Sequence, residues 1–167
     1  SAASDVYKRQ IRIHTELPIA IPKSKRNIEL TKGSYQKPSL TDEEIRRIYQ
    51  ESIAVVVPLK DVHQPTGYSV TLQAMACGKP VILSRIRGLW APELLVDGEN
   101  CILVTPGDSR EIADAINRII GDADLRQRIG LAARKTVLNH FSLHPSALST
   151  ERLFKIGFEA RSKVTHL

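Results

Sequence analysis

Residues 53–83 read IAVVVPLKDVHQPTGYSVTLQAMACGKPVIL, and this stretch decides the fold. A β-branched run stops at Pro58, a polar loop follows, and residues 69–77 are compatible with a helix that has Gly78 at its C′ position. Pro80 blocks continuation of that helix, and residues 81–83 form a second apolar run. Short apolar runs of this kind are typical of parallel strands buried on both faces. The stretch therefore predicts strand, helix, strand.

The signals upstream of this unit are weaker. Residues 11–39 carry a short apolar alternation followed by many prolines and lysines, which indicates a strand remnant and a long loop. Thr41 and Glu44 then form a capping box, and the apolar spacing behind them predicts a helix over residues 42–51.

Downstream, the same alternation of elements continues. Pro92 suits the first turn of a short helix, and residues 101–104 give a third apolar strand. Asp108 and Glu111 form a second cap pair, in front of a helix whose apolar periodicity runs to Gly121.

Two further helices are expected over residues 122–140 and 146–162.

Short buried strands alternating with helices predict an α/β domain of three layers, Rossmann-like, with a parallel sheet. Ligands of such sheets bind at the carboxyl ends of the strands. The loops after Val57, Leu83 and Val104 are therefore the places to look for a site.

Composition sets the class of protein. The 167 residues are 42% hydrophobic and 25% charged, which is ordinary for a globular domain with a real core. The formal charge of +6 suits an anionic small ligand or an acidic membrane surface, but the basic residues are spread along the chain, so nucleic acid is not expected as a partner. A solvated basic surface is the simpler interpretation.

Targeting and cysteine signals are few. The chain shows neither an apolar stretch of about 18 residues nor a leader pattern, which predicts a cytoplasmic protein, with peripheral contact at the inner membrane face as an open alternative. Cys77 and Cys101 lie among apolar neighbours and are interpreted as reduced core residues, so no metal or redox site is expected.

The first ten residues have an unusual feature. In one reading frame they back-translate to TCGGCAGCGTCAGATGTGTATAAGAGACAG, which resembles a transposase-based sequencing adapter. We therefore expect residues 1–10 to be a tail outside the fold, which would begin near Ile11.

The loop after Val57 joins a strand end to a helix start. Free backbone N–H groups and the positive end of the helix dipole make such a junction suited to a phosphate or a diphosphate. Gly67 permits close approach of a ligand to the backbone, and Ser69 or Thr71 would add a hydroxyl donor. The alternative is an ordinary turn, because every doubly wound domain has several such junctions.

Residues 64–81, QPTGYSVTLQAMACGKPV, resemble the donor-site signature of group 1 (family 4) glycosyltransferases, which have the GT-B fold. In that family a Glu precedes a Gly-Phe-Gly-type loop, a second Glu follows eight positions on, and Ala-Met-Ala-x-Gly-x-Pro-Val comes next. The likeness extends through Gly88, Glu93 and the pair Phe141 and Ser142, and covers about residues 40 to 145.

The resemblance implies the C-terminal half of a hexosyltransferase-like enzyme that binds a nucleoside diphosphate sugar as substrate, without a cofactor. The acceptor would be held by an N-terminal domain outside these residues, and a retaining outcome without a metal requirement is implied. No residue is assigned a catalytic or metal-binding role. The residues that the resemblance places at the donor are Gln64, Pro65, Thr66, Gly67, Tyr68, Ser69, Val70, Gln73 and Glu93.

Two positions depart from the family pattern. Alignment on residues 74–78 puts Gln73 in place of the second Glu and Pro65 in place of the first. Gln73 retains hydrogen-bonding groups for the ribose that the family Glu is expected to hold, whereas Pro65 cannot stabilise positive charge near the sugar. The loss of both carboxylates favours a second hypothesis, a non-catalytic sugar-nucleotide-binding or regulatory module. A nicotinamide-dependent oxidoreductase ranks behind both, because no Gly-x-Gly-x-x-Gly follows a predicted strand.

Other polar and aromatic residues near these loops have two interpretations each. His63 is expected to be a surface residue, and Trp90 to pack against the sheet edge. Arg85 and Arg87 follow a strand end and either contact phosphate or are solvated. Glu93 is either near the ligand or a first-turn carboxylate that complements a helix dipole.

Overall fold

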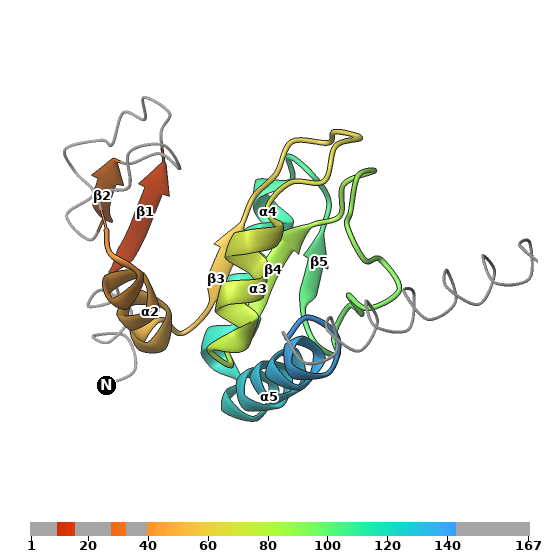
Figure 1. Cartoon of the computed structure of the whole chain (residues 1–167). Helices are drawn as coiled ribbons and strands as arrows, with labels where there is room; N and C mark the ends of the chain where they lie inside the picture. Colours follow the sequence, from red (N-terminus) through yellow and green to blue (C-terminus); the bar gives the residue numbers. More distant parts are fainter. Residues whose placement is uncertain (1–9, 16–27, 33–39, 143–167) are drawn as a thin grey trace, which may run out of the picture. The chain divides into compact units, whose positions relative to one another are not determined.

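The computed structural model describes residues 10–15, 28–32 and 40–142 (Figure 1). The chain divides into two compact units, Ser1–Ile45 and Arg46–Leu167, and each is described by itself. The helix predicted over residues 146–162 and the first nine residues of the leading tail lie outside the described residues.

The first unit contains a pair of parallel strands. β1 (Ile11–Thr15) pairs in register with β2 (Ile28–Lys32). Gln10 Nε2 and Arg12 Nε both donate to Glu29 Oε2, at 3.0 and 3.1 Å. The strand at residue 11 is as predicted, but the expectation of a loop through residues 28–32 is wrong.

Helix α2 (Asp42–Glu51) begins at the predicted capping box. Glu44 Oε2 accepts from the Thr41 backbone N at 2.7 Å, and Thr41 Oγ1 accepts from the Glu44 N at 3.3 Å. The two side chains thus satisfy backbone donors at the helix start reciprocally.

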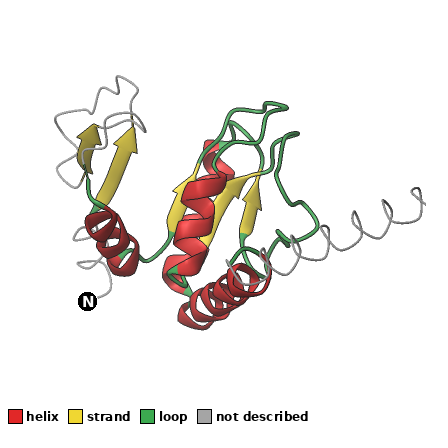
Figure 2. Ribbon diagram, viewed as in Figure 1, coloured by secondary structure: helices red, strands yellow, loops and turns green. Residues whose placement is uncertain are grey.

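The second unit contains a parallel sheet in the order β3-β4-β5, with α3 crossing from β3 to β4 (Figure 2). Its elements lie within about two residues of the predicted ones. They are β3 (Val55–Val57), α3 (Tyr68–Ala76), β4 (Val81–Ser84), β5 (Ile102–Val104), α4 (Ser109–Gly121) and α5 (Ala123–His140).

Alternate residues of the strands point to opposite faces of this sheet. Leu83 and Leu103 pack with α3 and α5 on one face, whereas Ile82 and Ile102 pack with α4 on the other. β4 is buried along its whole length, as expected for a central strand covered on both sides. This is the predicted three-layer Rossmann-like arrangement. Because the three strands are parallel, their carboxyl ends lie at the same edge of the sheet.

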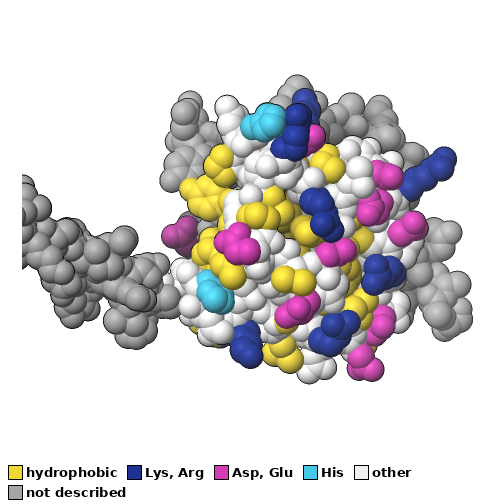
Figure 3. All heavy atoms as spheres, turned by 90° about the vertical axis from the view of Figure 1, so that its right-hand side faces the viewer, with side chains coloured by type: hydrophobic (Ala, Val, Ile, Leu, Met, Phe, Trp, Pro, Cys, Tyr) yellow, Lys and Arg dark blue, Asp and Glu magenta, His cyan; other side chains and the backbone are white. Residues whose placement is uncertain are grey.

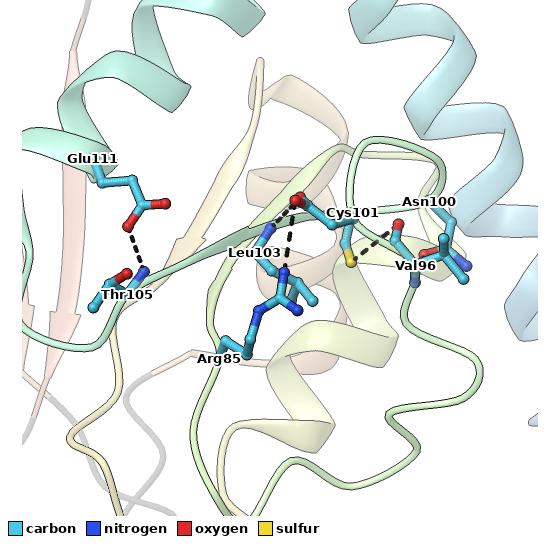
Figure 4. A network of polar contacts seen from close by, with 8 residues as sticks. Arg85, Val96, Asn100, Cys101, Leu103, Thr105 and Glu111 are labelled. Carbon is cyan, nitrogen blue, oxygen red and sulfur yellow. Dashed lines mark hydrogen bonds and ion pairs between the residues drawn. The ribbon is translucent and has the colours of Figure 1, made fainter.

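The caps of α4 and α5 fix how the chain leaves the sheet. Asp108 accepts from the Arg110 and Glu111 backbone N atoms, which confirms the predicted N-cap. The Glu111 carboxylate accepts from the Thr105 N at 2.6 Å, so it holds the end of β5 (Figure 4). Asp122 caps α5 by accepting from the Leu125 backbone N at 2.8 Å.

The short helix expected at Pro92 is wrong, since residues 92–94 form a turn. Ala91 precedes the turn with φ 115°, and its O accepts from the N atoms of Leu94 and Leu95 at 3.0 and 3.1 Å. The buried Asn100 side chain then takes the backbone groups that a helix would use. Its Nδ2 donates to Leu94 O at 2.7 Å and its Oδ1 accepts from Val96 N at 2.9 Å.

Candidate functional site

The start of α3, at the carboxyl edge of the sheet, lacks a side-chain cap. Its N-cap residue is Gly67 with φ 73°, which offers no side-chain cap, and the first turn contains no acidic residue. Within residues 10–15, 28–32 and 40–142, no side chain takes the place of that cap. Helices α4 and α5, by contrast, are capped by Asp108 and Asp122. The first N–H groups of α3 and the positive end of its dipole are therefore available to an anion.

Gly67 holds this helix start against the end of β3. A Cβ at this position would lie 3.0 Å from Leu59 Cδ1 and 3.1 Å from Val57 Cγ1. The left-handed φ independently disfavours any side chain. Glycine at residue 67 is thus favoured chiefly by the backbone conformation, and a Cβ would also crowd the Leu59 and Val57 methyl groups.

The loops after β3 and β4 are joined closely. The Gly88 backbone N donates to Val62 O at 2.8 Å, and a Cβ on Gly88 would lie 2.4 Å from His63 O. Asp61 accepts from the Arg87 backbone N at 2.9 Å and pairs with Arg87 Nε at 3.0 Å. The loop that leads into α3 is therefore positioned by the loop after β4.

Both arginines after β4 are paired with carboxylates. The backbone hydrogen bond from Arg87 lowers the pKa of Asp61, and the nearby guanidinium adds to the effect. Arg85 lies 3.6 Å from Asp97, whose other oxygen accepts from the Leu103 N at 2.8 Å (Figure 4). The predicted phosphate contacts of Arg85 and Arg87 would require these pairs to rearrange.

Gln73 lies in the second turn of α3 with its side chain exposed. Its Oε1 accepts from the Tyr49 hydroxyl at 3.2 Å. Burial raises the pKa of Tyr49, with a smaller contribution from Cys77. Sequence reasoning did not single out Tyr49, because a contact between residues 24 positions apart has no local signal.

An aromatic cluster adjoins the start of α3. Trp90 makes edge contacts with Tyr68 and Phe141, at ring-centroid distances of 6.5 and 5.6 Å. The Trp90 ring also packs against the core, in agreement with its predicted packing role. Its Nε1 is buried without a hydrogen-bond partner among the described residues.

Most of the predicted donor residues surround the start of α3. Thr66 and Gly67 are half-buried there, while five others are exposed: Gln64, Pro65, Tyr68, Ser69 and Val70. Thr71 is fully buried, so Ser69 supplies the exposed hydroxyl.

Glu93 stands apart from this group. It is exposed in the turn formed by residues 92–94, which follows β4 in the chain. Because that turn is not a helix, its alternative interpretation as a first-turn carboxylate is wrong.

The surface around the second unit is mixed in charge. On the face shown in Figure 3, Lys and Arg side chains are interspersed with Asp and Glu. His63 is exposed, as expected of a surface residue. Within residues 10–15, 28–32 and 40–142, no three His, Cys, Asp or Glu side chains gather as metal ligands. None of the helices in those ranges is long and apolar enough to cross a membrane.

Residues 15–122 match the family described as glycosyl transferases group 1. The chain belongs to this family. An uncharacterized glycosyltransferase of Methanocaldococcus jannaschii is 33% identical over 115 residues, which is 69% of this chain and 28% of that protein. The α-maltose-1-phosphate synthase of Mycolicibacterium smegmatis is 30% identical over 122 residues, or 70% of this chain and 30% of that enzyme. The chain thus spans less than a third of the length of these two relatives.

Solved structures of glycosyltransferases share the fold. Anabaena HepE in complex with uridine diphosphate (UDP) superposes with a TM-score of 0.64 at 26% identity, over 78% of this chain and 33% of HepE. The C-terminal domain of the group 1 glycosyltransferase LpcC from Francisella tularensis gives 0.57 at 28% identity, over 71% of this chain and 55% of that domain. The chain has the Rossmann-like architecture of the C-terminal half of a GT-B glycosyltransferase.

Proposed function

We propose that residues 40–167 form the nucleotide-sugar-binding domain of a glycosyltransferase and that the start of α3 holds the diphosphate of the donor. The observation that carries the proposal is the helix start without a side-chain cap, in a member of the group 1 family. The likeness to HepE, solved with UDP and with UDP-glucose, supports a nucleoside diphosphate sugar as the ligand.

The chemistry of the helix start suits a diphosphate. The N–H groups of Tyr68, Ser69 and Val70 precede Thr71, whose N donates to Gly67 O and so closes the first turn. Phosphate oxygens would accept from these first-turn donors, and the exposed Ser69 hydroxyl would add another bond. The helix dipole favours the negative charge.

The rest of the donor would extend along α3. Gln73 lies one to two turns beyond the diphosphate, within reach of a ribose, and Glu93 and the loop from Gln64 would border the sugar. The parent enzyme would transfer the glycosyl group to an acceptor held by an N-terminal domain outside these residues. A cytoplasmic location belongs to the same proposal, with peripheral contact at the inner membrane face as the alternative.

A second candidate is a sugar-nucleotide-binding module that performs no transfer. It is favoured by neutral Pro65 and Gln73 at the positions where the family pattern has carboxylates. Transfer of sugar by the full-length parent would exclude this candidate. Donor binding without turnover across a broad panel of acceptors would favour it.

The binding proposal is tested by adding an acid to the helix start. Glu in a first turn stabilises a helix but repels a phosphate, so Ser69→Glu should preserve the fold and weaken UDP binding at least about tenfold. Calorimetry with UDP, guanosine diphosphate and adenosine diphosphate first identifies the nucleotide bound. Ser109→Glu, which makes the same change of residue in the first turn of α4, is the control and should bind as the unmodified chain does. Equal affinity of Ser69→Glu and the control would refute the proposed site.

A further inference from the structure

We infer that Tyr49 fixes the orientation of the Gln73 amide, so that Gln73 meets the donor nucleotide with its Nε2 hydrogens and not with its carbonyl oxygen. Tyr49 is thus a positioning residue for the donor site. The inference rests on the proposed function, because it assumes that Gln73 contacts the nucleotide.

The hydrogen bond joins the packed side chain of Tyr49 to the exposed side chain of Gln73. Tyr49, on α2, is half-buried and packs against the core that β3, β4 and α3 share. The Gln73 side chain is exposed and would otherwise exchange among several rotamers. The bond from the Tyr49 hydroxyl to Gln73 Oε1, at 3.2 Å, therefore restricts Gln73 before a ligand arrives. Such preorganisation lowers the ordering cost of binding.

The direction of the bond follows from the chemistry of the two groups. A glutamine amide has one acceptor oxygen and one NH₂ donor group, and a phenol can donate or accept. The atoms in contact decide the direction: Gln73 Oε1 carries no hydrogen and can only accept, so the Tyr49 hydroxyl donates. With Oε1 taken by this donor, the Nε2 hydrogens remain for oxygen atoms of the ligand.

This arrangement differs from a glutamate at the same position. A carboxylate offers acceptors alone and requires hydroxyl donors on the ligand, whereas the Gln73 NH₂ group requires oxygen acceptors. Ribose hydroxyls can serve either role. The neutral side chain thus keeps a ribose contact with the hydrogen-bond direction reversed, and Tyr49 enforces that reversal.

The orientation can be tested without a ligand by NMR of the Gln73 side chain. Tyr49→Phe keeps the ring and removes the hydroxyl. If the hydroxyl donates to Oε1, the Gln73 carbonyl carbon should shift upfield while its Nε2 hydrogens change little. Gln127, exposed on α5, serves as the internal control and should not change. A shift confined to one Nε2 hydrogen would mean that the amide donates to the phenol, and would overturn the inference.

The consequence for binding is tested by a double-mutant cycle with UDP, or with whichever nucleoside diphosphate the calorimetric panel identifies. Tyr49→Phe should weaken binding about two- to tenfold, and should have no further effect in a Gln73→Ala background. A merely structural role of Tyr49 would give additive losses, which would contradict the inference.

The outcomes separate the inference from the function. If Gln73→Ala weakens binding and Tyr49→Phe does not, the positioning role fails and the donor site stands. If no nucleoside diphosphate binds, the proposed function fails. If Gln73→Ala leaves the affinity unchanged, the proposed contact between Gln73 and the nucleotide fails. The NMR comparison would then still decide the amide orientation.

Discussion

The Asp61 carboxylate contacts Arg87 through both of its oxygens. Oδ1 accepts from the Arg87 backbone N at 2.9 Å, and Oδ2 pairs with Arg87 Nε at 3.0 Å. This pair joins the loop that enters α3 to the loop that follows β4. It sits at the edge of the sheet where the donor site is proposed, so its charge state should matter for both stability and binding.

The Asp61 pair predicts a pH-dependent stability. The backbone hydrogen bond from Arg87 lowers the pKa of Asp61 below its ordinary value of 3.8. The stabilisation is therefore fully present above that ordinary value and is lost as the pH falls through the lower folded-state pKa. Asp61→Asn should lower the melting temperature by a few degrees at most near neutral pH, and the difference should shrink below about pH 4.

Thermal melts between pH 2.5 and 7 check this prediction, with the exposed Asp114→Asn as the control. If the melting temperatures of Asp61→Asn and the unmodified protein differ by the same amount down to pH 2.5, the charge of Asp61 does not contribute to stability.

The close approach at Gly88 predicts a severe effect of one methyl group. A Cβ there would lie 2.4 Å from the backbone O of His63 and 2.6 Å from that of Gln64. Gly88→Ala must therefore displace the backbone of the loop that leads into α3. Chemical denaturation should show a loss of about 1–3 kcal/mol, and UDP affinity should fall with it. Gly121→Ala, with no atom within 4 Å of the new Cβ, should be neutral or stabilising by up to about 1 kcal/mol. Equal stability of the two variants would refute the packing argument.

The buried Asn100 predicts a third effect on stability. Its side chain bonds to Leu94 O, Val96 N and Thr136 Oγ1, and so ties the turn after β4 to α5. Asn100→Ala leaves the part-buried Leu94 O and Val96 N without these partners and should cost about 1–3 kcal/mol. The exposed neighbour Glu99→Ala should change the free energy of unfolding by less than about 0.5 kcal/mol. Denaturation of both variants gives the comparison, and a loss at Asn100 no larger than that at Glu99 would contradict it.

Local patterns predicted the second unit well, because its elements carry strong periodic signals. The β-branched runs around Val57 and Val81, and the cap at Asp108, gave the strands and α4 nearly at their observed bounds. β2 was missed because its alternation of Ile28 and Leu30 is short and lies beside basic and proline-rich residues.

Other features depend on contacts distant in sequence and have no local signal. The turn at Pro92 follows from the side chain of Asn100, eight residues on, and the partner of Glu111 is Thr105 rather than its own cap residue. The donor loop was recognised by its resemblance to a family, but the bond between Tyr49 and Gln73 required the fold. Sequence therefore predicts which loop holds the proposed site, and the structure supplies the contacts among the residues of that loop and its neighbours.

The central claim is that a nucleoside diphosphate binds at the start of α3. Backbone amide NMR during titration with the nucleotide identified by calorimetry tests this claim most directly. The largest shifts should fall on the N–H groups of residues 67–70, with a smaller change at Gln73. The capped start of α4, residues 109–111, should be unaffected and serves as the internal reference. Saturable binding that shifts residues 109–111 and leaves residues 67–70 unchanged would contradict the account.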